Sequence, residues 1–194
     1  EVKNYFENIS TRMMAENTST QPIGQTMIPL RVLTLIVTGP HQPSILVLEP
    51  VEDTPEGKSR IVPIWIGATE AVQLGIAVEH MHFPRPTTHD LFLDALTNLD
   101  ARIDHVLITD VKKQTFFARL FLRQGGRLIE LDARPSDALA LALRQDAPFY
   151  IDEETLEKAS FPYLFKQKKS EEVELKEFRS FLERISPEDF GNNA

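Results

Sequence analysis

The sequence predicts an α+β domain in which a mixed, mostly antiparallel sheet packs against several helices. The first observation behind this class is a series of strand-like segments, 102–110, 115–123 and 127–133, joined by the tight turns VKKQ and QGGR. Consecutive strands with such short turns form an antiparallel meander, here over residues 102–133. The second observation is that further β-branched segments, and segments with helical spacing of apolar residues, flank this meander on both sides.

Three strands are expected before the meander and one after it. Residues 30–38, 44–51 and 60–67 are rich in β-branched residues or leucine, and turns containing Gly or Pro separate them. Pro63 lies inside the third segment. Because proline cannot donate a backbone hydrogen bond, it indicates an edge strand or a bulge. The segment PFYID, residues 148–152, is the short strand after the meander.

Helices are predicted where apolar residues recur three or four positions apart. The first covers residues 68–81, with a stripe of Ala71, Leu74, Val78 and Met81. The second runs from about residue 88 to residue 99, with a stripe of Leu91, Phe92, Ala95, Leu96 and Leu99. A third helix follows Arg134, and a fourth covers residues 153–160.

Composition along the chain divides it into three parts. Residues 1–27 are polar and lack sustained periodicity, so we expect a flexible N-terminal arm. Residues 28–160 hold the α+β domain. Residues 161–194 are expected to form a C-terminal tail with an amphipathic helix, which would dock on its own domain or on a second subunit.

Bulk composition narrows the classes of function. The 194 residues contain no cysteine, which excludes disulfides and thiolate metal sites and fits a reducing compartment. No apolar stretch reaches the roughly 18 residues of a membrane span, so we expect a cytoplasmic protein without a membrane partner. The net charge of −8 argues against binding nucleic acid by bulk electrostatics. A local basic patch, or phosphate contact through a divalent ion, stays possible.

Polar side chains gather just before the third helix. In ELDARPSDALALAL, Asp132, Arg134, Ser136 and Asp137 precede an apolar run suited to a buried helix. An earlier segment, RPTTHDL, repeats the order Arg-Pro, hydroxyl, Asp, helix. Capping accounts for part of this pattern, because a Ser or Thr can bind free backbone N–H groups and Asp opposes the positive helix end. Each cap contributes about 1 kcal/mol.

Capping does not require the arginines, His89 or a carboxylate at the end of a strand. We therefore consider a polar cleft lined by Glu70, His89, Asp90, Asp110, Asp132 and Asp137. Several carboxylates with a histidine suit Mg²⁺ or Mn²⁺, and such an ion can activate water against a phosphodiester. The alternative is that the same carboxylates form structural salt bridges with Arg85 and Arg134.

The strand TFFARLFLR carries a second candidate surface. Phe117, Arg119, Phe121 and Arg123 alternate on one face of this strand. Aromatic rings interleaved with arginines can stack on bases and hold phosphates. The simpler alternative is a strand packed on both faces, whose arginine stems cover apolar neighbours or reach a partner.

Several motifs in order resemble the bifunctional nuclease family over about residues 30–160. They are IVPIWIGATEA, PRPTTHDL, HVLITDVKKQTFFARL, ELDARPSDALALALR and APFYIDEE. The resemblance implies a compact α+β domain, commonly dimeric, with nuclease activity on RNA and DNA. The family motifs coincide with Glu70, Arg85, His89, Asp90, Asp110, Asp132, Arg134, Ser136 and Asp137.

Two functional hypotheses follow. In the first, the protein is a phosphodiesterase in which Asp90, Asp132 and Asp137 hold the ion and Glu70 or His89 handles the proton. Phosphate and substrate contacts would then come from Arg85, Arg119, Arg123, Arg134 and Ser136. In the second hypothesis, the protein is a non-catalytic dimeric module that binds a ligand or protein, and its Arg–Asp pairs only fix the helix ends.

Overall fold

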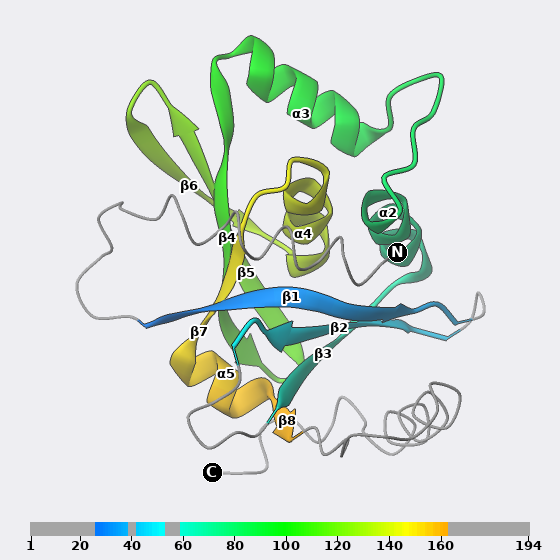
Figure 1. Ribbon diagram of the computed structural model, residues 1–194, viewed down its shortest axis with the longest axis vertical. Coiled ribbons are helices and arrows are strands. Elements are labelled where there is room, and N and C mark those ends of the chain that lie inside the picture. Colours follow the sequence, from blue (N-terminus) through cyan, green and yellow to red (C-terminus); the bar gives the residue numbers. More distant parts are fainter. Residues whose placement is uncertain (1–25, 39–41, 53–58, 163–194) are drawn as a thin grey trace.

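The meander predicted over residues 102–133 forms one end of a sheet in the computed structural model, which describes residues 26–38, 42–52 and 59–162. Within these residues, eight strands pair in the order β6-β5-β4-β7-β1-β2-β3-β8. All neighbours are antiparallel except β4 and β7, which run parallel. The helices α2 to α5 pack against this sheet (Figure 1). The α+β class and the mostly antiparallel sheet are therefore confirmed.

The meander consists of β4 (Ala101–Lys112), β5 (Thr115–Gln124) and β6 (Arg127–Ala133). Both turns use left-handed backbone: Lys113 and Gln114 have φ of 45° and 74°, and Gly125 and Gly126 have 51° and 81°. Alternation in β5 is as predicted, because the face with Phe116, Ala118, Leu120 and Leu122 is buried. The opposite face of β5, with the arginines, is therefore the outer one.

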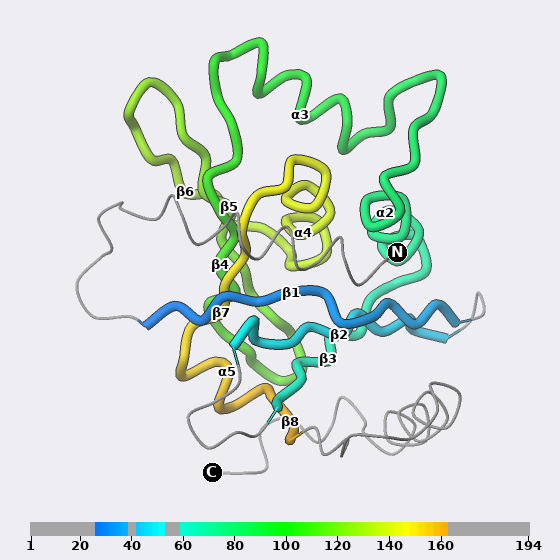
Figure 2. Tube along the Cα trace, in the orientation of Figure 1, coloured from blue at the N-terminus to red at the C-terminus, as the bar shows by residue number. Residues whose placement is uncertain are grey.

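The other half of the sheet comes from both ends of the described chain. It contains β1 (Met27–Ile36), β2 (Ser44–Pro50), β3 (Arg60–Ile66) and the two-residue β8 (Phe161–Pro162). The short β7 (Phe149–Asp152) joins the halves, because it pairs with β4 on one side and β1 on the other (Figure 2). Among the described residues β8 pairs with Arg60 and Ile61, and Pro63 pairs with β2 alone, which fits the edge position that the proline predicted.

The helices are α2 (Ala68–Val78), α3 (Thr88–Asn98), α4 (Pro135–Arg144) and α5 (Glu153–Ala159). The central one is α4, which contacts α2, β4 and β5 (Figure 1). Its segment from Ala138 to Ala142 is almost fully buried, together with Leu74 of α2 and Leu120 of β5. No helix among the described residues is long and apolar enough to cross a membrane.

Two helix predictions need correction. The first helix ends at Val78, not residue 81, because His80 takes a left-handed φ of 48° and turns the chain away. Met81 is consequently exposed rather than part of the core stripe. In α3 the predicted stripe packs only at one point: Leu96 is buried, whereas Leu91 and Leu99 face solvent. The helix therefore touches the sheet with a narrower face than its sequence indicates.

The predicted strand, helix and turn boundaries otherwise agree to within about three residues, which is ordinary for helix and strand ends. The N-terminal arm and the C-terminal amphipathic helix lie almost wholly outside the described residues.

Candidate active site

The charged segment before α4 does not cap that helix with its serine. The N-cap of α4 is Arg134, whose side chain makes no capping hydrogen bond, and Pro135 occupies the first helical position. Ser136 is buried in the second position. In α3 the corresponding carboxylate does act as predicted: Asp90 Oδ2 accepts hydrogen bonds from the backbone N–H of Thr87 at 2.8 Å and from its hydroxyl at 2.7 Å.

Arg134 joins α4 to α2 through its guanidinium group. Its Nε donates to Asp137 Oδ2 at 2.7 Å and its Nη2 to Asp137 Oδ1 at 3.2 Å, so the pair is bidentate. Its Nη1 donates to Glu70 Oε1 at 2.9 Å. These hydrogen bonds raise the pKa of Arg134, so the group stays cationic. We call Glu70, His89, Arg134 and Asp137 the α4-entrance cluster.

His89 brings α3 into this cluster. Its Nε2 lies 3.9 Å from Asp137 Oδ1, too far for a hydrogen bond, and its buried Nδ1 has no partner. Burial lowers the pKa of His89 and the nearby Arg144 lowers it further, which outweighs the opposite effect of Asp137 and Asp90. The imidazole is therefore neutral near pH 7, and neither of its ring nitrogens makes a hydrogen bond to a described residue.

Arg144 connects α4 to α2 and α3 next to the α4-entrance cluster. It was not among the site residues predicted from the sequence. Its side chain is only 8% exposed. Its Nε donates to Asp90 Oδ1 at 3.1 Å, its Nη2 to Gln73 Oε1 at 3.1 Å and its Nη1 to the Ala140 carbonyl at 2.8 Å. Burial raises the pKa of Asp90, but hydrogen bonds from Thr87 and Arg144 outweigh it, and the net direction is down.

Asp132 does not lie with this cluster. It pairs across the sheet with Arg119, whose Nη1 is 3.1 Å from Asp132 Oδ1 and whose Nε is 3.3 Å from Glu130 Oε1. These residues occupy the outer face of β5 and β6, whereas α4 packs on the inner face. Asp110 pairs with Lys112 at 2.8 Å and lies within the field of Lys158 on α5, so its charged neighbours are not those of the cluster. The structure thus brings together Glu70, His89, Asp90 and Asp137 but not Asp110 or Asp132.

The remaining predicted contacts are dispersed. Arg85 lies in the exposed loop between α2 and α3. Arg123 is held by Asp104, with Nε to Oδ1 at 2.6 Å, and the same carboxylate contacts His105 Nδ1 at 2.7 Å. The His105 ring stacks on Phe121 with centroids 4.2 Å apart. Arg119 and Arg123 are both paired with carboxylates, and their side chains are 41% and 31% exposed against 65% for Arg134, which favours the structural interpretation of the β5 outer face.

The carboxylates predicted to bind a metal ion do not form an ion site in the structure. Asp90, Asp132 and Asp137 were expected to bind Mg²⁺ or Mn²⁺, yet each is paired with a different arginine and Asp132 is on the other face. Among the described residues, no three His, Asp or Glu side chains are grouped closely enough to hold a metal ion. We therefore derive no reaction step through a metal.

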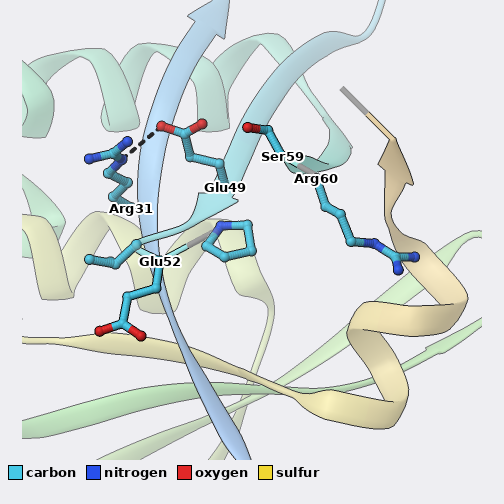
Figure 3. Close-up of a pocket in the computed structure, with 7 residues that line it drawn as sticks. Arg31, Glu49, Glu52, Ser59 and Arg60 are labelled. Atoms are coloured by element: carbon cyan, nitrogen blue, oxygen red, sulfur yellow. Dashed lines mark hydrogen bonds and ion pairs between the residues drawn. The ribbon is translucent and has the colours of Figure 1, made fainter. Parts of the chain in front are cut away.

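A separate cavity of about 250 Å³ opens beside β1, β2 and β3 (Figure 3). Both arginines in its lining are engaged: Arg31 Nε donates to Glu49 Oε1 at 2.7 Å, and Arg60 Nε donates to Ser160 Oγ at 2.6 Å. The cavity shares no residue with the α4-entrance cluster. Among the described residues that line it there is no histidine, whereas the α4-entrance cluster contains His89.

Comparison with known proteins identifies the family. The model of the bifunctional nuclease domain matches residues 51–163, more than half of the chain. The chain belongs to this family. An uncharacterized protein of Mycobacterium tuberculosis is 36% identical over 169 residues, which cover 83% of this chain and 96% of that protein.

Two plant relatives carry the family name. Bifunctional nuclease 1 of Oryza sativa subsp. japonica is 28% identical over 125 residues, 63% of this chain and 36% of the plant protein. Bifunctional nuclease 2 of Arabidopsis thaliana is 26% identical over 116 residues, 58% of this chain and 33% of the plant protein. The chain thus spans about a third of each plant protein, and the whole α4-entrance cluster lies inside the bifunctional nuclease domain.

Proposed function

We propose that this protein hydrolyses phosphodiester bonds in RNA or DNA at the α4-entrance cluster. Family membership supports the reaction class, together with the plant relatives that are named bifunctional nucleases. The single observation that supports this position of the active site is that His89, neutral and without a hydrogen bond to a described residue, lies beside the ion pair of Arg134 and Asp137. An uncommitted base and a fixed cation are what in-line attack of water on a phosphodiester requires.

Each residue has a role that its contacts allow. Arg134, exposed at the N-terminus of α4, is the phosphate-binding group, and the positive helix end adds to its field. His89 accepts a proton from the attacking water, because its neutral ring can take one near pH 7. Glu70 and Asp137 hold the guanidinium group. The departing oxygen takes its proton from solvent.

Water is the nucleophile consistent with both nucleic acids. DNA has no 2′-hydroxyl group, so a site that cleaves both RNA and DNA cannot depend on internal attack by the sugar. Attack by water breaks one P–O bond and leaves a phosphate on one fragment and a hydroxyl on the other. We therefore expect no cyclic phosphate among the RNA products.

The test compares two equivalent substitutions, Asp137→Asn inside the cluster and Asp132→Asn on the outer face. Labelled single-stranded RNA and DNA are incubated with purified wild type, both variants and His89→Gln, and melting temperatures are recorded. We expect His89→Gln to lose about 10²–10⁴-fold in cleavage rate, because it removes the general base. Asp137→Asn should also lose activity, because it loosens the guanidinium group of Arg134. Asp132→Asn should cleave like wild type.

Other outcomes decide against the proposal. Loss of cleavage in Asp132→Asn with retention in Asp137→Asn would place the site on the outer face of the meander. Equal traces of cleavage in all four well-folded proteins would indicate a contaminating nuclease. Each reaction is run with EDTA, Mg²⁺ and Mn²⁺, so a metal requirement would also be seen.

A second candidate is a non-catalytic binding module. The observation that favours it is that Arg134 and Arg144 tie α2, α3 and α4 together through paired carboxylates, which is a sufficient structural role. In that case Asp137→Asn would lower the melting temperature, and neither wild type nor any variant would cleave above the level of a contaminating nuclease. Melting temperatures measured with the cleavage rates separate the two candidates.

We also propose that the protein is a cytoplasmic homodimer. Exposed apolar side chains on α3, Leu91 and Leu99 among them, supply a surface suited to a second copy. The absence of cysteine fits a reducing compartment. Light scattering of wild type and Leu91→Glu tests the dimer: the variant should be a monomer, and an unchanged mass would exclude this surface.

A further inference from the structure

Gly67, between β3 and α2, is glycine for a reason other than backbone freedom. It is the N-cap of α2, with φ −70° and ψ 164°, an extended conformation open to any residue. A Cβ atom added there would overlap Oε2 of Glu70 and lie 3.3 Å from its Cδ. The space that a side chain would fill is thus already occupied by the Glu70 carboxylate.

From this position the Glu70 carboxylate reaches a residue far along the chain. Glu70 is the third residue of α2, and its side chain folds back toward the N-cap. Its other oxygen, Oε1, accepts the 2.9 Å hydrogen bond from Arg134 Nη1. Asp137 binds the remaining side of the guanidinium through Nε and Nη2. Glu70 therefore supplies the contact that fixes Arg134 from a second helix.

We propose that Gly67 is a positioning residue for Arg134: its missing side chain makes room for Glu70 to hold the guanidinium where it receives phosphate. The proposal rests on the proposed function only for the identity of the ligand. If Gly67 acted only as an N-cap, a change to alanine would weaken the helix end but leave Arg134 unaffected.

Gly67→Ala tests this with little disturbance of the fold. Alanine can adopt the same backbone angles, and the overlapping atom is the end of a flexible side chain, which can rotate away. The matched control is Gly75→Ala in the same helix, where the new Cβ would meet only Leu35 Cδ2 at an ordinary 3.8 Å. We expect kcat/KM to fall between about tenfold and hundredfold in Gly67→Ala, chiefly through KM, and to stay unchanged in the control.

A double-mutant cycle separates positioning from general damage. If Gly67 acts through Glu70, then Gly67→Ala combined with Glu70→Gln should cleave no more slowly than Glu70→Gln alone. Multiplicative losses would overturn the proposal. Should Gly67→Ala lower the melting temperature, the double variant with Glu70→Ala should melt close to Glu70→Ala alone, because the overlap is gone. A loss as large in that background as in wild type would also overturn the proposal.

A measurement that does not depend on catalysis tests the role of Gly67 separately from the nuclease proposal. NMR of the Arg134 guanidinium protons, assigned with Arg134→Lys, should show faster Nε–Cζ rotation in Gly67→Ala and wild-type behaviour in Gly75→Ala. An unchanged guanidinium signal in Gly67→Ala would refute the positioning role, whatever the activity. A loosened guanidinium in a protein that cleaves nothing would support positioning while the nuclease proposal failed.

Discussion

Removal of the Arg144 guanidinium should destabilise the protein through the junction of three helices. In Arg144→Ala the carboxylate of Asp90 and the amide of Gln73 lose hydrogen bonds of 3.1 Å each, and the Ala140 carbonyl loses one of 2.8 Å. Breaking a buried ion pair from one side costs about 3–5 kcal/mol. Because Asp90 is 37% exposed and can bind water instead, we expect about 2–3 kcal/mol.

Urea denaturation and thermal melting measure this effect. For a protein of this size, the expected loss corresponds to a fall in melting temperature of roughly 4–12 °C. The control is Arg102→Ala, an exposed arginine on β4, which should change stability by less than about 0.5 kcal/mol. The losses of stability in Asp90→Asn and Arg144→Ala should also be less than additive in the double variant, because both substitutions remove the same contact. A loss below about 0.5 kcal/mol in Arg144→Ala would refute this prediction.

Three further predictions concern titration and packing. Burial lowers the pKa of His89 below its ordinary 6.5, so the unfolded state binds more protons there; stability should fall as the pH drops through 6.5, and His89→Gln should flatten this slope. Burial raises the pKa of Asp104, but hydrogen bonds from Arg123 and His105 lower it more. Stability should therefore fall as the pH drops from 3.8, less so in Asp104→Asn. On α3, Leu96 is 8% exposed and Leu91 is 60% exposed, so Leu96→Ala should cost about 2–5 kcal/mol and Leu91→Ala under about 0.5 kcal/mol in a monomer.

Each of these has a direct check. An NMR midpoint for His89 above 6.5 would contradict the neutral ring that the catalytic proposal needs. Acid unfolding with the same midpoint in wild type and Asp104→Asn would show that this carboxylate contributes nothing. Equal losses in Leu96→Ala and Leu91→Ala would mean that α3 is covered in solution, and their dependence on protein concentration would then be measured.

The fold was largely predictable because its strongest signals are local. The alternation of apolar and arginine residues in 115–123 indicated the buried face of β5, and Pro63 indicated a part of β3 that pairs on one side among the described residues. The ends of the helices were harder to predict from the sequence. Left-handed residues that are not glycine follow α2, α3 and α4, namely His80, Asp100 and Asp146, and their side chains give a weak signal for that conformation.

The candidate site was only partly predictable, and Asp132 shows why. Its separation from Asp137 was already implied by the turn QGGR, because pairing of Gln124 with Arg127 fixes the register that sets Arg119 against Asp132. We expected the strand face that carries Glu130 and Asp132 to open toward the start of α4, whereas α4 packs on the opposite face of the meander. Arg144 gave no such signal, since an arginine in the last turn of a helix ordinarily complements the helix dipole. Its partners became visible only once α2 and α3 were placed beside it.

The four-residue strand β7 also bears on the order in which the chain can fold during synthesis. The segment β1 to β3 can pair locally as soon as it leaves the ribosome, because its strands are neighbours in sequence. The edge of β1 that later meets Tyr150 and Ile151 must wait until about 120 more residues have been made. During that interval β1 has an unpaired edge. At typical rates of 5–20 residues per second the wait lasts roughly 6–24 seconds, and a chaperone that binds extended apolar segments would find its target there.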